Sequence, residues 1–221
     1  NLIIERKMKM TWQLPSGTRS EAIDSEVSKL LYQSGCKNLS FSPESGSVQV
    51  LKDIKKKIEP KKMLKAMKSC IDNNMIVKTN IILGFPNEKL INVIQSYIFI
   101  IKMAVIGVHE TAVWTFSAYP GSEIYSDLIR KNKISHTDEY YISLMNYADP
   151  FNTVSWSNHF GKGTLQFLMQ FALILFYGTS FVLRPTRLIK NIINIRNKKP
   201  VTRLEHVFIK AFYRHIVNYE I

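Results

Sequence analysis

Three short segments of this 221-residue sequence combine glycine, proline, hydroxyl and carboxylate residues at the end of a hydrophobic run. They are Phe-Ser-Pro-Glu-Ser-Gly-Ser at 41–47, Leu-Gly-Phe-Pro-Asn-Glu at 83–88 and Phe-Ser-Ala-Tyr-Pro-Gly-Ser-Glu at 116–123. Glycine lets a backbone approach a ligand closely, and glutamate can accept hydrogen bonds from ribose hydroxyls or an ammonium group. One such segment is more typical of an ordinary turn, because serine, glycine and proline dominate turns. Three in succession favour a ligand site.

The elements that would position these segments alternate between strand and helix. Strands are predicted at 9–14, 38–42, 76–83 and 110–118, and helices at 20–33, 60–74, 90–106 and 122–131. Parallel strands joined by helices form either part of a (β/α)8 barrel or a doubly wound open sheet. Both architectures bind ligands at the carboxyl ends of the strands, where the three segments lie. The predicted fold class is therefore α/β, with both architectures open.

Together the segments resemble the second half of a radical S-adenosylmethionine enzyme, in the branch that often carries a cobalamin-binding domain ahead of the barrel. The resemblance covers about residues 8–135, and its matching positions are 11–13, 19, 35–36, 43–47, 50–51, 56–57, 84–88 and 119–123. It implies the C-terminal part of a partial (β/α)6 TIM-like barrel, strands three to six, over residues 1–149. An α-helical, basic C-terminal extension is expected over 150–221.

The resemblance also implies which residues bind S-adenosylmethionine. They are Arg19, Ser42, Glu44, Ser45, Gly84, Phe85, Pro86, Glu88, Tyr119, Pro120 and Gly121. Glu44 and Ser45 match the contacts to the ribose and the amino-acid part, whereas Arg19 matches a cation that could pair with the cofactor or substrate carboxylate.

The backbone near Gly84 matches the part of the strand-five motif that lies against the adenine, and Glu88 matches a residue that braces that loop. The motif that begins at Tyr119 matches the sixth-strand contact beside the adenine. The sequence departs from the family at Asn87, where glycine is usual, although asparagine also tolerates a turn.

The two cysteines, Cys36 and Cys70, are too few for a disulfide scaffold and too far apart for the family's Cys-x3-Cys-x2-Cys motif. The resemblance implies a [4Fe–4S] cluster, so its ligands, and any cobalamin domain, are expected upstream of Asn1 in a longer protein. No metal ligands are expected in this chain, which should generate no radical alone.

The parent reaction would begin with reductive cleavage of S-adenosylmethionine, followed by cobalamin-assisted methyl transfer or a radical rearrangement on a hydrophobic substrate. The alternative is a non-catalytic, cluster-less remnant that binds a nucleotide-like ligand or acts as a membrane-associated scaffold.

The net charge of +13 is unevenly distributed, and it is concentrated in the last third of the chain. Residues 1–150 contain twenty basic and fifteen acidic side chains, whereas residues 151–221 contain ten basic and only two acidic ones. A hydrophobic content of 46% excludes global disorder. The basic residues of the tail interleave with aliphatic ones and belong to no recognised nucleic-acid module, so nucleic acid is not an expected partner.

An uncharged run of 21 residues, 163–183, precedes most of these cations. Three interpretations remain open: a helical domain that packs on the barrel, an interfacial membrane anchor over 163–203, and a membrane-spanning helix. The expected partner is a small-molecule or lipid-like substrate. The expected location is cytoplasmic, at the inner face of the membrane if the anchor forms.

Overall fold

The computed structural model describes residues 2–17, 22–145, 147 and 153–214. The chain forms two compact units, Asn1–Phe176 and Tyr177–Ile221, which are described separately below. The predicted domain boundary at 149/150 stays a prediction.

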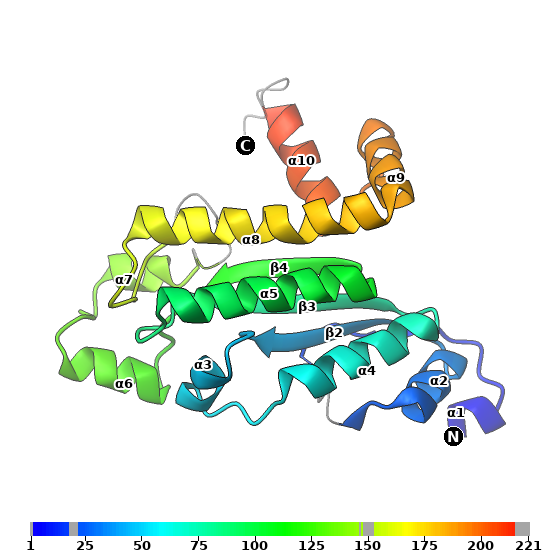
Figure 1. Cartoon of the computed structure of the whole chain (residues 1–221), viewed down its shortest axis with the longest axis horizontal. Coiled ribbons are helices and arrows are strands. Elements are labelled where there is room, and N and C mark those ends of the chain that lie inside the picture. Colours follow the sequence, from blue (N-terminus) through cyan, green and yellow to red (C-terminus); the bar gives the residue numbers. More distant parts are fainter. Residues whose placement is uncertain (1, 18–21, 146, 148–152, 215–221) are drawn as a thin grey trace. The chain divides into compact units, whose positions relative to one another are not determined.

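The first unit is built on a four-stranded parallel sheet in the order β1-β2-β3-β4 (Figure 1). Its strands are β1 (Trp12–Leu14), β2 (Cys36–Glu44), β3 (Ile76–Leu83) and β4 (Glu110–Thr115). The order follows the sequence without a reversal, so these four strands contain no topological switch point of the kind that a doubly wound sheet requires. The predicted α/β class and parallel pairing are confirmed.

Alternating side chains divide the sheet into two chemically different faces. In β3, Val77, Ile81 and Leu83 are buried, whereas Lys78 and Asn80 between them are half-buried. Helices cover one face of the sheet (Figure 1); they are α2 (Ser25–Gln33), α4 (Pro60–Asp72) and α5 (Leu90–Ile106). Helix α4 contacts both β2 and β3.

Local signals explain where these helices begin and end. Helix α2 begins after Asp24, whose Oδ1 accepts a hydrogen bond from Val27 N at 2.8 Å. Ser20, the first residue of the helix predicted over 20–33, lies outside the described residues. Helix α4 has Pro60 in its first turn, and α5 ends at Gly107, whose φ of 101° is left-handed.

The fourth strand ends at Thr115 rather than at the predicted residue 118. The reason lies in its neighbour: β3 stops at Leu83, because Gly84 turns the backbone away with a φ of 86°. One further hydrogen bond, from Phe116 N to Leu83 O at 2.8 Å, closes the ladder. Four short helices also belong to this unit: α1 (Leu2–Glu5), α3 (Val48–Asp53), α6 (Glu123–Arg130) and α7 (Asp138–Ser143).

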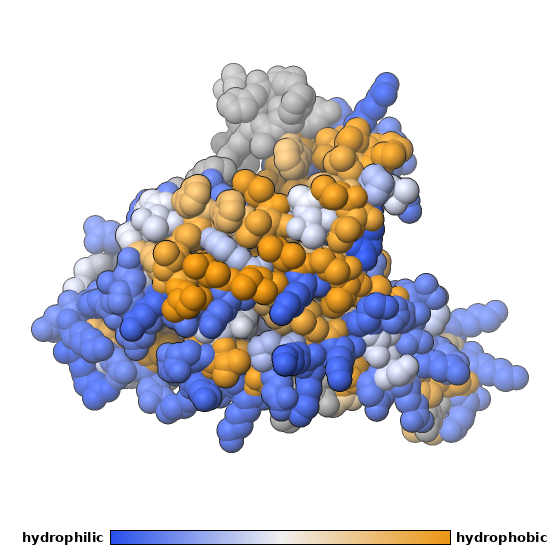
Figure 2. Space-filling model, in the orientation of Figure 1, coloured by the Kyte–Doolittle hydropathy of each residue, from blue (hydrophilic) through white to orange (hydrophobic). Residues whose placement is uncertain are grey.

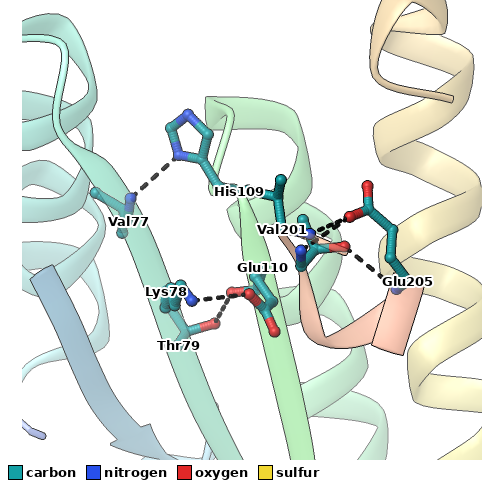
Figure 3. A network of polar contacts seen from close by, with 8 residues as sticks. Val77, Lys78, Thr79, His109, Glu110, Val201 and Glu205 are labelled. Carbon is teal, nitrogen blue, oxygen red and sulfur yellow. Dashed lines mark hydrogen bonds and ion pairs between the residues drawn. The ribbon is translucent and has the colours of Figure 1, made fainter. Parts of the chain in front are cut away.

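Helix α8 (Lys162–Leu183) is the one helix of the described part that is long and apolar enough to cross a membrane, although 33% of its most apolar window is buried. The second unit contains α9 (Pro185–Arg196) and α10 (Arg203–Arg214). Helix α10 begins with a capping box. The Glu205 carboxylate accepts hydrogen bonds from Val201 N at 2.6 Å and Thr202 N at 3.0 Å, while Thr202 Oγ1 accepts one from Glu205 N at 3.3 Å (Figure 3).

Candidate functional site

The loops that follow β2, β3 and β4 leave the same edge of the sheet, because all three strands are parallel and adjacent. A cavity of about 260 Å³ lies among the segments that follow these strands. The predicted residues Phe85, Pro86 and Glu88 line it, and an ion pair between Lys55 and Glu123, 2.5 Å between Nζ and Oε2, also borders it. Ligand pockets usually enclose about 300–1,000 Å³, so this cavity suits one part of a ligand.

The loop after β3 is organised by the carboxylate of Glu88. Its Oε2 accepts a hydrogen bond from Gly84 N at 2.6 Å, and its own backbone N donates to Phe85 O at 3.0 Å. The residue is only 1% exposed, and Oε1 has no hydrogen-bond partner in the part of the chain that the structure describes. Burial raises the pKa of Glu88 to about 7, against the opposing effect of the backbone hydrogen bonds from Gly84 and Phe85.

Gly84 allows this loop to pack closely against α8. Its φ of 86° is left-handed, and a Cβ atom placed on it would lie 2.7 Å from Cδ2 of Leu165. Next to it, the rings of Phe85 and Phe116 pack with centroids 5.1 Å apart. The apolar wall of the cavity therefore comes from a loop that tertiary packing holds in place.

Glu44, at the end of β2, has a left-handed backbone that is unusual for a residue with a side chain, with a φ of 61°. Its Oε1 lies 2.5 Å from Nζ of Lys56, and the two side chains are 20% and 29% exposed. Strained backbone of this kind is often found at functional sites. At this position Glu44 presents a carboxylate that is already paired with the Lys56 cation.

The other polar residues after β2 hold the loop against α5. Ser45 is fully buried, and its Oγ lies 3.1 Å from both Ser96 Oγ and Ser47 N. Ser96 Oγ also accepts a hydrogen bond from Gly46 N, and Ser47 Oγ accepts one from Asn92 Nδ2 at 3.0 Å. These contacts give Ser45 a positioning role. Its predicted contact with a cofactor stays a prediction.

The predicted residues after β4 lie apart from the cavity lining. Tyr119 is 50% exposed, and its hydroxyl donates to Leu144 O at 3.4 Å. Partial desolvation of the ring, and then the neighbouring Tyr147, raise the pKa of Tyr119. Pro120 and Gly121 are exposed, and Gly121 has a left-handed φ of 87°. Arg19 lies outside the described residues.

Two polar residues that the sequence analysis did not select join Ser42 in a chain of hydrogen bonds across the sheet. Trp114 Nε1 donates to Asn80 Oδ1 at 3.1 Å, and Asn80 Nδ2 donates to Ser42 Oγ at 3.4 Å. The available signal was the polar residue at every second position of β3, Lys78 and Asn80, within an apolar run. Parallel strands buried on both faces lack this alternation, which indicates one polar face.

A second polar network ties together the amino-terminal ends of β3 and β4 (Figure 3). Val77 N donates to Nδ1 of His109 at 3.1 Å, and Lys78 Nζ lies 3.2 Å from Oε2 of Glu110. Thr79 Oγ1 donates to the Glu110 carbonyl at 3.5 Å. These contacts are at the opposite ends of the strands from the cavity, where they fix the register of the two strands.

The cysteines do not fit a metal cluster. Both are buried with 0% exposure; burial raises the pKa of Cys36, and it raises that of Cys70 to about 11. A cluster is bound by thiolates, which these environments disfavour. Within residues 2–17, 22–145, 147 and 153–214, no three His, Cys, Asp or Glu side chains are grouped so that they could hold a metal ion.

Comparison with known proteins gives a distant sequence relative. No protein-family model matches the chain. The chain is 26% identical over 215 residues to an uncharacterized methyltransferase of Pyrococcus horikoshii; the match includes 95% of this chain but 43% of that protein. The archaeal Elp3 of Methanocaldococcus infernus, with an N-terminal deletion, superimposes with a TM-score of 0.45 at 15% identity, over 65% of this chain and 34% of that one. The chain thus has a sequence relative named as a methyltransferase and spans less than half of its length.

Proposed function

We propose that this chain is the S-adenosylmethionine-binding, C-terminal part of a radical S-adenosylmethionine enzyme with a partial (β/α)6 barrel. The sequential parallel order of β1 to β4 supports a barrel segment, because neighbouring barrel strands follow one another in the chain. The three predicted loops all follow strands of this sheet on its carboxyl edge, where such folds bind ligands.

The main support for the proposal is Glu88, which lines the cavity and has one buried carboxylate oxygen without a hydrogen-bond partner among the described residues. A buried carboxylate oxygen without a partner is costly, and a ligand that donates a hydrogen bond to it would remove that cost. S-adenosylmethionine offers several such donors in its adenine amino group, ribose hydroxyls and ammonium group. Phe85 would supply the apolar wall. Glu44, which is paired with Lys56 and does not line the cavity, would supply a second acceptor to the part of the ligand that extends beyond it.

The bound S-adenosylmethionine would supply a sulfonium centre for methyl transfer or reductive cleavage. The residues of this chain would bind and orient it: Gly84 and Glu88 fix the loop, and Phe85 excludes water from the cavity wall. Cys36 and Cys70 have no part in holding a cluster. Of the two predicted reactions, methyl transfer is favoured by the name of the Pyrococcus relative. No residue of this chain is assigned to cobalamin.

Calorimetric titration of the chain with S-adenosylmethionine tests the proposal. We expect measurable binding at pH 8, where Glu88 is mainly ionised. We expect Glu88→Ala to weaken it about tenfold or more, since a hydrogen bond to a charged group contributes about 1.5–3 kcal/mol. Glu139→Ala, at an exposed glutamate of α7, is the matched control and should bind like the wild type. An absence of binding by the wild type, or equal affinities of the two variants, would overturn the proposal. The scaffold hypothesis would then be favoured.

A further inference from the structure

We propose that an exposed apolar surface on α5 and the first part of α8 docks onto the surface of an anionic lipid bilayer. The surface, called here the α5–α8 face, is defined by Ile91, Ile94 and Ile98 of α5 and by Phe167, Phe171 and Ile174 of α8. Figure 2 shows apolar side chains gathered over these two helices. The inference is independent of the proposed cofactor binding.

The exposure of these side chains is unusual for a helix that covers a sheet, such as α5, and for the helix α8 that contacts it. The three isoleucines of α5 are 57%, 42% and 47% exposed, and the three residues of α8 are 63%, 38% and 65% exposed. Other residues of α5, such as Val93, Ile100 and Met103, are buried. Helix α5 is therefore apolar on its outer side as well as on its buried side, whereas the outer side of a covering helix is normally polar.

The spacing of the residues places them in one stripe on each helix. Along α5 the steps are three and four residues, from 91 to 94 to 98, and along α8 they are four and three, from 167 to 171 to 174. Contiguous exposed apolar patches of this kind are rare on soluble proteins unless they bind something.

Contacts between the two helices make the surface a preformed one. The Tyr97 hydroxyl of α5 donates to the Leu168 carbonyl of α8 at 2.9 Å, and the rings of Tyr97 and Phe171 pack edge to face, 5.5 Å apart. The rings of Phe167 and Phe171 are stacked with centroids 6.0 Å apart. Docking would therefore need little ordering of this surface.

The charges around the surface favour lipid over another protein. The sequence has no Asp or Glu from 89 to 109 or from 153 to 204, so both helices lack acidic residues altogether. Their charged residues are Lys89 just before α5, Lys102 within it and Lys162 at the start of α8. Helical protein interfaces commonly pair acidic with basic residues at their edges, whereas anionic headgroups attract cations alone.

The segment after α8 is likewise free of acidic residues, and it is strongly basic. Residues 184–199 contain six basic residues and no acidic ones, interleaved with Leu188, Ile189, Ile192 and Ile193, which are 40–56% exposed. Each Lys or Arg near an anionic membrane contributes about 1 kcal/mol to binding. An apolar surface joined to an acid-free, basic sequence fits an anionic bilayer.

Vesicle cosedimentation of the 221-residue chain tests this proposal. We expect binding to vesicles of phosphatidylglycerol and phosphatidylcholine, with weaker binding to phosphatidylcholine alone. The double variant Ile94→Glu/Phe171→Glu should reduce binding at least tenfold, since burying one such side chain contributes about 1.5–3 kcal/mol. Ile142→Glu, at a 60% exposed residue of α7, is the matched control and should bind like the wild type. Equal binding of all three proteins would overturn the proposal.

A labelling measurement separates docking from a general loss of structure. Because both native thiols are buried, Ile98→Cys introduces a single accessible site for a polarity-sensitive fluorophore. We expect a blue shift of its emission on anionic vesicles, and none for the label at Ile142→Cys. No shift at position 98 would overturn the proposal. A concentration-dependent dimer that Ile94→Glu abolishes, without any vesicle binding, would also overturn it and assign the surface to contact between two copies of the chain.

Discussion

The loops after β2 and β3 are both packed against helices, yet they differ in how their buried polar atoms are satisfied. After β2, the hydroxyls of Ser45 and Ser47 each have partners, and these tie the loop to α5. After β3, Glu88 keeps one buried carboxylate oxygen without a partner among the described residues. The serine hydroxyls after β2 thus have complete contacts, whereas the carboxylate after β3 can still accept a hydrogen bond. At the end of β2 only Glu44 presents a carboxylate, and it is already paired with Lys56.

The largest effect should come from adding a methyl group to the glycine of the β2 loop. A Cβ at Gly46 would lie 2.5 Å from Phe99 Cβ and 2.7 Å from the Gln95 carbonyl oxygen, neither of which can move without moving α5. We expect Gly46→Ala to lower the free energy of unfolding by about 3 kcal/mol, as overpacking does in rigid surroundings. Denaturant titration followed by circular dichroism measures this change.

Gly84→Ala is the corresponding change in the β3 loop, and it should lower the free energy of unfolding by less than Gly46→Ala does. Its Cβ would meet the end of the Leu165 side chain rather than helix backbone. The left-handed backbone costs a non-glycine residue about 1–2 kcal/mol. Gly163→Ala, in α8 and with no atom within 4 Å of the added Cβ, is the control. A greater loss from Gly84→Ala than from Gly46→Ala would contradict the view that the β2 loop is the more rigid one.

The second prediction concerns the pH dependence of stability, which Glu88 in the β3 loop should cause. The pKa of Glu88 in the folded protein, about 7, is raised above its ordinary value of 4.5 because the carboxylate is buried. The folded state therefore holds a proton that the unfolded state releases. Its stabilising contribution is complete below pH 4.5 and is lost as pH rises through about 7. A shift of this size corresponds to about 3 kcal/mol.

Glu88→Gln should remove this pH dependence, because glutamine stays neutral. We expect the variant to match the wild type at pH 4.5 and to be the more stable protein at pH 8, as measured by urea midpoints across this range. Glu139→Gln should retain the wild-type profile. A wild-type profile in Glu88→Gln would mean that the carboxylate is ionised in the fold without cost, and that the two loops are alike.

The sequence predicts those elements whose pattern is local. The bounds of β3 and α5, Ile76–Leu83 and Leu90–Ile106, agree with the prediction to the residue, because each is a long apolar run between turn residues. The end of β4 was predicted three residues too late, since it depends on where the neighbouring strand turns at Gly84. A boundary set by another strand leaves no local signal.

The candidate site shows the same division between local and tertiary information. Sequence reasoning selected Phe85, Pro86 and Glu88, and the structure places all three around one cavity. It assigned Ser45 to a cofactor contact and Glu88 to bracing the loop. It had no signal for the burial of Ser45, which depends on Ser96, 51 residues away. Likewise, Ser47 has the residue type of a helix cap, but its hydroxyl is taken by Asn92 and caps nothing. Whether a polar atom has a hydrogen-bond partner therefore depends on tertiary contacts.

Ser45→Ala removes one hydroxyl from the completed network and should have a smaller effect than Gly46→Ala in the same loop. The change leaves Ser96 Oγ and Ser47 N each with one contact fewer in a buried site, so we expect a loss of about 2 kcal/mol in the free energy of unfolding. Ser126→Ala, at an exposed serine of α6, should change it by less than about 0.5 kcal/mol.

S-adenosylmethionine affinity, measured on the same variants, distinguishes the two roles of Ser45. A positioning residue whose loop remains folded should leave the affinity unchanged within about twofold, whereas the loss of a direct hydrogen bond should weaken it by about fivefold or more. Unchanged stability together with weakened affinity would place Ser45 on the ligand and make the β2 loop a binding loop as well.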